Sequence, residues 1–117
     1  MDVMTIRSRD RLELRLREYL DACYHGETPP RVSEFADSLG ISAAQLSKTF
    51  RRLFGLHLSD YLKTKQVEYA EALLQQTSHT VTKVAYMAGF GTRRTFFRTY
   101  RRVKGITPDQ FRRNRMF

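Results

Sequence analysis

The sequence is poor in cysteine and lacks long apolar runs, and both absences restrict what the protein can be. With one cysteine, the 117-residue chain cannot form an internal disulfide, which is typical of proteins in a reducing compartment. No stretch of about 18 apolar residues is present, so no membrane-spanning helix is expected. The N-terminal residues MDVMTIRSRDRLELRL also lack the apolar segment of a secretory signal. We therefore expect a cytoplasmic protein.

Acidic residues are almost absent from the C-terminal part of the chain. Between Gly91 and Phe117 there is one acid, Asp109, against nine basic residues: Arg93, Arg94, Arg98, Arg101, Arg102, Lys104, Arg112, Arg113 and Arg115. The preceding ninety residues are nearly balanced, with twelve basic and eleven acidic side chains, so this end carries most of the net charge of +9. Such a segment attracts a polyanion, either nucleic acid or an anionic membrane face. A merely well-solvated surface is the alternative.

No residue pattern typical of a catalytic or metal site is recognisable. There is no pair of carboxylates and no Ser/His/Asp set at a catalytic spacing. His25, His57 and His79 stand near predicted helix ends without a second ligand at metal spacing. We therefore expect no enzymatic activity, no cofactor and no metal. Cys23, at an apolar helix position, is expected to be a packed thiol.

The sequence contains the same unit twice. The segment VSEFADSLGIS (32–42) matches VTKVAYMAGFGT (81–92), with its glycine, Gly40, aligned on Gly89. Gly91 is an extra residue in the second copy, after which the match continues at an offset of 50 through 61 and 111. Chance agreement of glycines, capping residues, apolar positions and an arginine pair over about thirty residues is improbable, which indicates an internal duplication.

Each copy predicts a helix, a short turn and a second helix. In the first copy, apolar residues at helical spacing predict a helix over 32–39 that ends at Gly40, since glycine suits a left-handed C-terminal position. Ser42 then caps a helix over about 43–54, with Gln45 completing a capping box. In the second copy the turn falls at Gly89, and the second helix begins after Thr92 and covers about 93–104. This is the helix-turn-helix pattern.

Three more helices are predicted around the two copies. The first, over 7–24, is closed off by Pro29-Pro30 and has one apolar face: Leu12, Leu16, Tyr19, Leu20 and Cys23. The second, over 59–76, has a face formed by Leu62, Tyr69, Ala70 and Leu73, with Val67 and Leu74 at its edge. Thr107-Pro108-Asp109-Gln110 opens the last. The prediction is an all-α fold of seven helices, with a first subdomain over 1–58, a linker helix over 59–77 and a second subdomain over 78–117.

The second helix of each copy has a buried line and an outward line. Leu46, Phe50 and Leu53 are expected inside the first copy, and Phe96, Tyr100 and Val103 inside the second. The outward residues are polar or basic, as a helix in a DNA major groove requires. We expect first-turn residues to read bases: Ala44, Gln45, Ser47, Lys48, Arg93, Arg94, Phe97 and Arg98. Residues at the caps and further along are expected to hold phosphates: Ser42, Arg51, Arg52, Thr92, Arg101, Arg102 and Arg112.

Two of these assignments stay open. Phe97 either contacts a thymine methyl group or packs sideways on its own module. Arg112, together with Arg113 and Arg115, either contacts phosphates or forms a soluble tail. Because the copies differ at 44 and 94 and at 47 and 97, an asymmetric DNA site is expected. The linker helix, roughly 27 Å long at 1.5 Å per residue, suits two reading helices in successive major grooves about 34 Å apart.

The segment VAYMAGFGTRRTFFRTYRRVKGITPDQFRR (84–113) resembles the signature of the DNA-binding domain of AraC/XylS-family bacterial transcription regulators. The resemblance covers about 7–113. It implies two helix-turn-helix subdomains joined by a linker helix, with double-stranded DNA and RNA polymerase as partners and a location with the bacterial nucleoid. It further implies either a small stand-alone member of the MarA-like kind or a C-terminal fragment without an effector or dimerisation domain. Its base-reading positions fall on Ala44, Ser47, Lys48, Arg93, Arg94, Phe97 and Arg98. The competing interpretation is a non-specific nucleic-acid-binding module, or an accessory domain of a larger regulator or enzyme.

Overall fold

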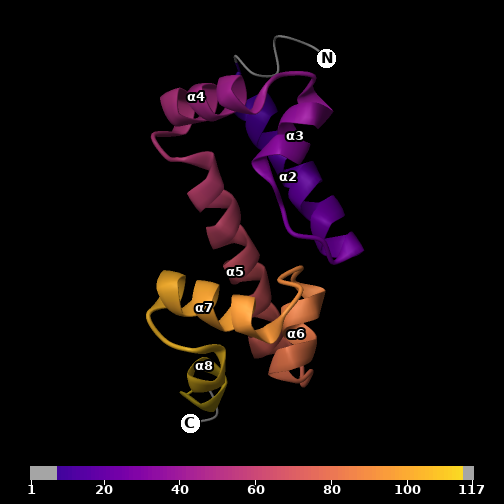
Figure 1. Cartoon of the computed structure of the whole chain (residues 1–117), viewed down its shortest axis with the longest axis vertical. Helices are drawn as coiled ribbons and strands as arrows, with labels where there is room; N and C mark the ends of the chain where they lie inside the picture. Colours follow the sequence, from indigo (N-terminus) through magenta and orange to yellow (C-terminus); the bar gives the residue numbers. More distant parts are fainter. Residues whose placement is uncertain (1–7, 115–117) are drawn as a thin grey trace.

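The computed structural model describes residues 8–114, which form seven helices and no strand (Figure 1). The helices are α2 (Arg9–Gly26), α3 (Val32–Leu39), α4 (Ala43–Phe54), α5 (Leu58–Gln76), α6 (Val81–Met87), α7 (Arg93–Lys104) and α8 (Pro108–Asn114). This confirms the predicted all-α class and helix order. Among these residues, no helix has both the length and the apolar character needed to cross a membrane.

Most helix ends lie where the sequence predicts them. Gly40 adopts a left-handed φ of 72° after α3, and the Ser42 side chain accepts the Gln45 amide at 3.0 Å to cap α4. Thr92 caps α7 in the same way, accepting the Thr95 amide at 3.1 Å. Before α8 both halves of a capping box form, since Thr107 and Gln110 each accept the backbone amide of the other. Within the described residues, Ser42 and Gln45 form only the first half of theirs, so that part of the prediction was wrong.

The first helix continues two residues beyond its predicted end at 24, to Gly26, and stops before Pro29-Pro30. The chain leaves α2 through Glu27, whose φ of 54° is left-handed, and the Glu27 amide bonds to the carbonyl of Tyr24 at 3.3 Å. Gly26 is therefore the last helical residue, and Pro29-Pro30 continues a loop that has already turned. Arg7, the predicted start, lies outside the described residues, and Ser8 caps the helix.

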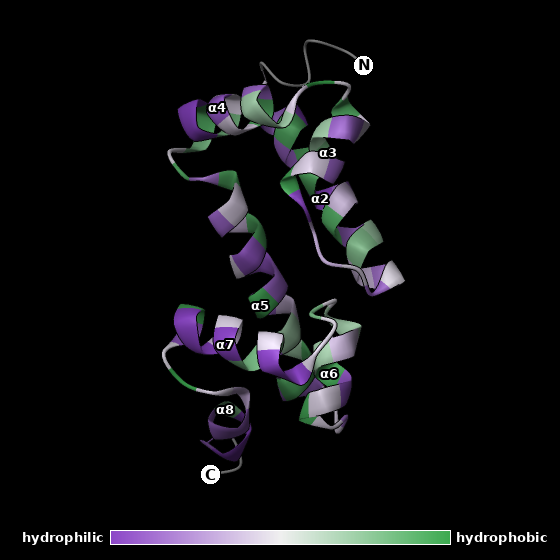
Figure 2. Ribbon diagram, viewed as in Figure 1, coloured by the Kyte–Doolittle hydropathy of each residue, from purple (hydrophilic) through white to green (hydrophobic). Residues whose placement is uncertain are grey.

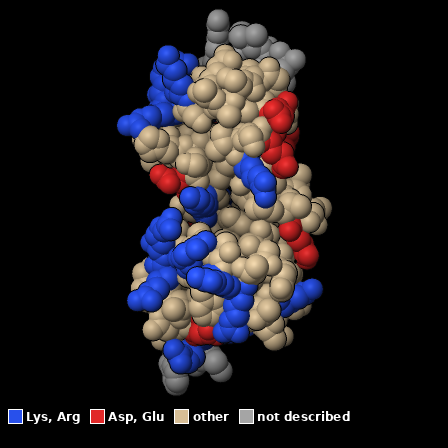
Figure 3. Space-filling model, viewed as in Figure 1, with Lys and Arg blue, Asp and Glu red and all other residues tan. Residues whose placement is uncertain are grey.

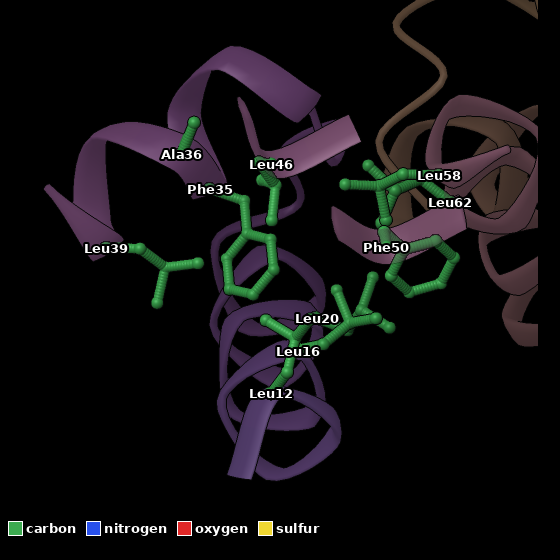
Figure 4. Packing of buried hydrophobic residues seen from close by; sticks show 10 residues of the cluster. All are labelled: Leu12, Leu16, Leu20, Phe35, Ala36, Leu39, Leu46, Phe50, Leu58 and Leu62. Carbon is green, nitrogen blue, oxygen red and sulfur yellow. The ribbon is translucent and has the colours of Figure 1, made fainter. Parts of the chain in front are cut away.

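Two hydrophobic clusters form the core, one for each helix-turn-helix unit. The first contains side chains of α2, α3, α4 and the start of α5 (Figure 4): Leu12, Leu16, Leu20, Phe35, Ala36, Leu39, Leu46, Phe50, Leu58 and Leu62. The second contains side chains of the rest of α5, α6, the following turn and α7: Val67, Ala70, Leu74, Val81, Val84, Ala85, Ala88, Phe90, Phe96 and Tyr100. Leu53 and Val103, expected inside, pack at the edges and stay partly exposed.

Helix α5 belongs to both clusters, and its buried face turns along its length. Leu58 and Leu62 enter the first cluster, whereas Val67, Ala70 and Leu74 enter the second. At 3.6 residues per turn these two groups point about a third of a turn apart around the helix axis. The predicted single face was therefore wrong in detail. Val67 and Leu74, placed at its edge, are fully buried, while Tyr69 and Leu73 are only half-buried.

The two halves also touch directly beside α5. Gly89, with a left-handed φ of 83°, lies so close to the 28–29 loop that a Cβ there would stand 2.6 Å from the carbonyl carbon and oxygen of Thr28. The rings of Tyr24 and Tyr69 stack with centroids 4.1 Å apart, and the Tyr24 hydroxyl donates to the Lys65 carbonyl at 3.1 Å. Burial raises the pKa of Tyr24, and the nearby carboxylate of Glu68 raises it further. These contacts fix the two halves relative to each other.

Candidate nucleic-acid interface

The turns of the two helix-turn-helix units explain why α4 and α7 project as they do. In each unit a short helix packs against the longer one that follows it, α3 against α4 and α6 against α7. The second turn is longer because it contains Gly91, which has a φ of 78° and open space around it. Helix α4 lies at one end of α5, and α7 crosses α5 near the other end (Figure 1). The molecule measures 48 × 26 × 22 Å along its principal axes.

Helix α4 is buried along one line and exposed along the other. Leu46 and Phe50 are fully buried in the first cluster and hold the helix in place. Figure 2 shows the resulting alternation of apolar and polar residues along the helix. Every α4 residue proposed from the sequence to contact DNA is exposed: Ala44, Gln45, Ser47, Lys48, Arg51 and Arg52.

Helix α7 is arranged in the same way, with more cationic residues. Phe96 and Tyr100 are fully buried, and their rings meet edge to face with centroids 5.6 Å apart. Five of the α7 residues proposed to contact DNA are exposed: Arg93, Arg94, Arg98, Arg101 and Arg102. Phe97 is half-buried and meets Phe96 edge to face at 6.2 Å, so it packs sideways in this structure.

Most exposed cations of α4 and α7 have no carboxylate partner among the described residues. Within residues 8–114, no carboxylate lies within ion-pair distance of Lys48, Arg52, Arg94, Arg98, Arg101 or Arg102, since the salt bridges there involve other residues. Figure 3 shows lysine and arginine gathered over both helices, with most acidic side chains on the opposite edge of this view. Three cations of these helices do have partners: Arg51 lies against the ring nitrogens of His57, Arg93 pairs with Asp109, and Lys104 pairs with Glu71. The surface is thus suited to an extended anion.

Arg93 is held by groups that the sequence did not associate with it. Its guanidinium bonds to the Asp109 carboxylate at 3.2 Å and to the Thr82 hydroxyl at 3.5 Å. It also lies 4.7 Å from the ring centroid of Phe97. Asp109 and Thr82 lie on α8 and α6, so only tertiary packing brings them to Arg93. The one sequence signal for this contact was that Asp109 is the only acid between 91 and 117. The side chain of Arg93 stays about half exposed.

Arg112, predicted to contact phosphate, binds backbone carbonyl groups of its own chain in this structure. Its guanidinium donates to the carbonyls of Leu74 and Thr77 at 3.3 Å, and to that of His79. It therefore satisfies carbonyls at the C-terminal end of α5, which otherwise have no helical partner. Arg113 is exposed, and Arg115 lies outside the described residues.

The proposed phosphate contacts at the helix starts are exposed but already serve as caps. Ser42 and Thr92 each accept a backbone amide, and the Thr92 hydroxyl donates to Thr95 at 2.9 Å. In the part of the chain that the structure describes, no group of three or more His, Cys, Asp or Glu residues is arranged to hold a metal ion.

Comparison with known proteins identifies the family. A model described as a helix-turn-helix domain matches residues 35–114, from α3 to the end of α8. A crystal structure from Chromobacterium violaceum described as a transcriptional regulator with an AraC-type DNA-binding domain is 30% identical, covers 88% of this chain and 93% of that one, and superposes with a TM-score of 0.71. The chain belongs to the AraC-type helix-turn-helix family.

Two further proteins resemble this AraC-type domain, one of them much longer and one solved with DNA. An uncharacterised HTH-type transcriptional regulator of Staphylococcus aureus (strain MSSA476) is 31% identical over 98 residues. The match covers 84% of this chain but 13% of that protein, so the chain spans about an eighth of the relative's length. The DNA-binding domain of AdpA, a global transcriptional factor solved in complex with a target DNA, is 25% identical with a TM-score of 0.73, covering 86% of this chain and 91% of that one.

Proposed function

We propose that this AraC-type domain binds one asymmetric duplex site by placing α4 and α7 in successive major grooves. The observation that carries the proposal is the pair of exposed faces on α4 and α7, where within residues 8–114 every cation except Arg93 and Lys104 lacks a carboxylate partner. At 19 residues α5 is roughly 28 Å long, close to the turn of B-DNA of about 34 Å. The likeness to AdpA, which was solved with its target DNA, supports the same interpretation.

Within this proposal, the first turns of both helices read bases. Arginine presents two parallel donors that match O6 and N7 of guanine, so Arg94 and Arg98 are the principal readers of α7. Arg93, held by Asp109, reaches the groove from the helix end. In α4 the readers are Ala44, Gln45, Ser47 and Lys48, where Gln45 pairs with adenine and Ala44 contacts a thymine methyl group. Phe97 contributes shape at the edge of the groove, because its ring packs on Phe96.

The remaining cations hold the phosphates that flank each groove. Arg51, Arg52, Arg101 and Arg102 lie in the second half of their helices, where the backbone of the duplex passes. Ser42 and Thr92 contribute at the helix starts. The guanidinium of Arg112 is occupied by carbonyl groups, so its contribution to phosphate binding is smaller than that of the α7 arginines. The division into 1–58, 59–77 and 78–117 is part of this proposal and is supported by the two core clusters.

The biological consequences belong to the same proposal. A transcription regulator of this family acts where bacterial DNA lies, so we infer a cytoplasmic location with the nucleoid. We also infer that the bound domain contacts RNA polymerase and has no enzymatic activity of its own. The chain spans a small part of the Staphylococcus relative, which is consistent with an effector or dimerisation domain elsewhere in the full regulator.

Selection from a random duplex library, followed by a footprint on the enriched sequence, tests this function. We expect one shared, non-palindromic motif protected in two major-groove segments about one helical turn apart. Arg94→Ala is expected to cost about 1–3 kcal/mol on that motif and to relax selection at one base position. Arg102→Ala serves as the comparison, because loss of a phosphate contact weakens all duplexes by a similar factor. Enriched duplexes without a common motif would instead favour a non-specific nucleic-acid-binding module.

A further inference from the structure

A basic cleft lies between the two halves of the molecule, next to the proposed reading surface. Its volume is about 440 Å³. The first half contributes the Pro29-Pro30 loop to its wall, and α7 forms the wall on the other side through Arg98 and Arg102. Lys63 and Gln66 of α5, together with the Gly89-Phe90 turn, complete the lining. The sequence did not single out Lys63, because only the fold brings this residue next to the arginines of α7.

The charge of the cleft is entirely positive. Lys63, Arg98 and Arg102 line it, and no acidic residue does. Within residues 8–114 none of the three cations forms an ion pair, whereas Lys65, two residues further along α5, pairs with Glu68 at 3.3 Å. Thr95 and Thr99 add hydroxyl groups to the α7 wall. Three uncompensated cations and two hydroxyls are the donors that a phosphodiester requires.

The width of the cleft is fixed by contacts beneath it. The buried Gln66 side chain donates to the Ala88 carbonyl at 3.0 Å and ties α5 to the turn before α7. The 28–29 backbone rests directly on Gly89, which brings the Pro29-Pro30 loop up to the same turn. The stacked rings of Tyr24 and Tyr69 hold the end of α2 against α5. The backbone segments that carry the cations of the cleft are thus fixed relative to one another.

The position of the cleft indicates its ligand. Arg98 and Arg102 belong to the exposed line of α7, so the cleft opens beside the helix face proposed to meet DNA. If α4 and α7 occupy successive major grooves, the strand between those grooves passes along α5, between the two halves. We propose that the cleft receives a backbone phosphate of this central strand and that Lys63 is its main contact. This inference rests on the proposed function and adds a contact from α5 at the centre of the site, beside the arginines of α7.

A salt titration of Lys63→Ala tests the inference, with Lys65→Ala as its control. Both variants remove one lysine from α5, but at 3.6 residues per turn the two side chains point to nearly opposite sides of that helix. The slope of log affinity against log salt is negative, and loss of one phosphate contact reduces its magnitude by about 0.9. The affinity ratio between wild type and Lys63→Ala should therefore narrow about 3.5-fold between 50 and 200 mM salt, while Lys65→Ala keeps the wild-type slope.

Duplexes with a single neutral methylphosphonate locate the contact. Replacing a phosphate between the two protected grooves should weaken the wild type and Lys65→Ala, but should not weaken Lys63→Ala any further. An equal loss in all three proteins would overturn the assignment of Lys63. Lys63→Arg keeps the charge and should retain the wild-type response to the substitution.

Other outcomes separate this inference from the proposed function. Enrichment without a shared motif refutes the function, and the cleft assignment with it. A two-groove footprint with an unchanged slope in Lys63→Ala refutes the cleft assignment alone. Titration of the free protein with inorganic pyrophosphate tests whether the cleft binds a small free phosphate compound instead of the DNA backbone. Binding that is lost in Lys63→Ala, together with an unchanged DNA slope, would make the cleft a small-anion site and overturn the proposal.

Discussion

Gly89→Ala is expected to be among the most damaging single-methyl changes in the described part of the chain. The new Cβ would stand 2.6 Å from the carbonyl carbon and oxygen of Thr28 and 2.9 Å from the nitrogen of Pro29. These are backbone atoms, so relief requires the 28–29 loop to move away from the second half. Overpacking of this kind costs about 1–3 kcal/mol, and the left-handed φ of 83° adds about 1–2 kcal/mol for a residue with a side chain.

The combined loss of about 2–5 kcal/mol is measurable by urea or thermal unfolding followed by circular dichroism. At about 4 °C per kcal/mol for a domain of this size, the melting temperature should fall by roughly 8–20 °C. Gly91→Ala is the matched control, because Gly91 has a similar φ of 78° but nothing within 4 Å of its Cβ position. It should lose only the backbone share of about 1–2 kcal/mol.

The difference between the two variants isolates the contact between the halves. If both lose the same stability, the 28–29 loop does not press on Gly89 as described, and the account of how the halves are fixed is refuted. Binding adds a second measurement. Displacement of the loop should weaken a duplex that contains both groove segments more than a duplex that contains only the segment read by α7.

Three further changes test other contacts. Asp109→Asn removes the ionic partner of Arg93 at 3.2 Å. We expect an altered base preference at one position in the duplex selection and less than about 1 kcal/mol of lost stability. An unchanged base preference would mean that the pair does not position Arg93. Thr92→Ala should cost about 1 kcal/mol in the free energy of unfolding through loss of the α7 cap, and Thr92→Ser should restore it. Burial, and then the nearby Glu71, raise the pKa of Tyr100 in the folded protein. Because this tyrosine ionises at lower pH in the unfolded chain, its contribution to the free energy of unfolding should be constant below about pH 10 and fall as the pH rises further. Tyr100→Phe should flatten this alkaline decline in unfolding experiments between pH 9 and pH 11, and an equally steep decline would contradict the assignment.

The sequence predicted local features well because each has a nearby chemical cause. Glycine at 40 and hydroxyl residues at 42 and 92 mark helix ends through bonds to neighbours three residues away, and the repeat indicates the second helix of each unit. The exposed and buried lines of α4 and α7 follow from periodicity alone. Leu53 and Val103 were predicted to be buried but are only partly buried, because both lie near the C-terminal end of their helix, at the edge of its cluster.

Features that depend on packing between distant segments could not be predicted in this way. The buried face of α5 turns along the helix because the helix contributes to two clusters. The sequence pattern predicted one apolar face for the whole helix. The Arg93–Asp109 pair, the carbonyl set around Arg112 and the cleft lysine at 63 each join elements far apart in the sequence. The base-reading and phosphate assignments themselves stay predictions until a bound duplex is studied.

The sharing of α5 between two clusters limits how this chain can be taken apart. Cutting α5 anywhere between Leu62 and Val67 would leave each piece with an unfinished interior and an exposed apolar end. Neither half is therefore expected to persist as an independent fold, and limited proteolysis should yield intact protein or small peptides rather than two stable fragments. The exposed residues of α4 and α7 can nonetheless change separately, so under the proposed function one copy can acquire a new DNA preference without disturbing the other.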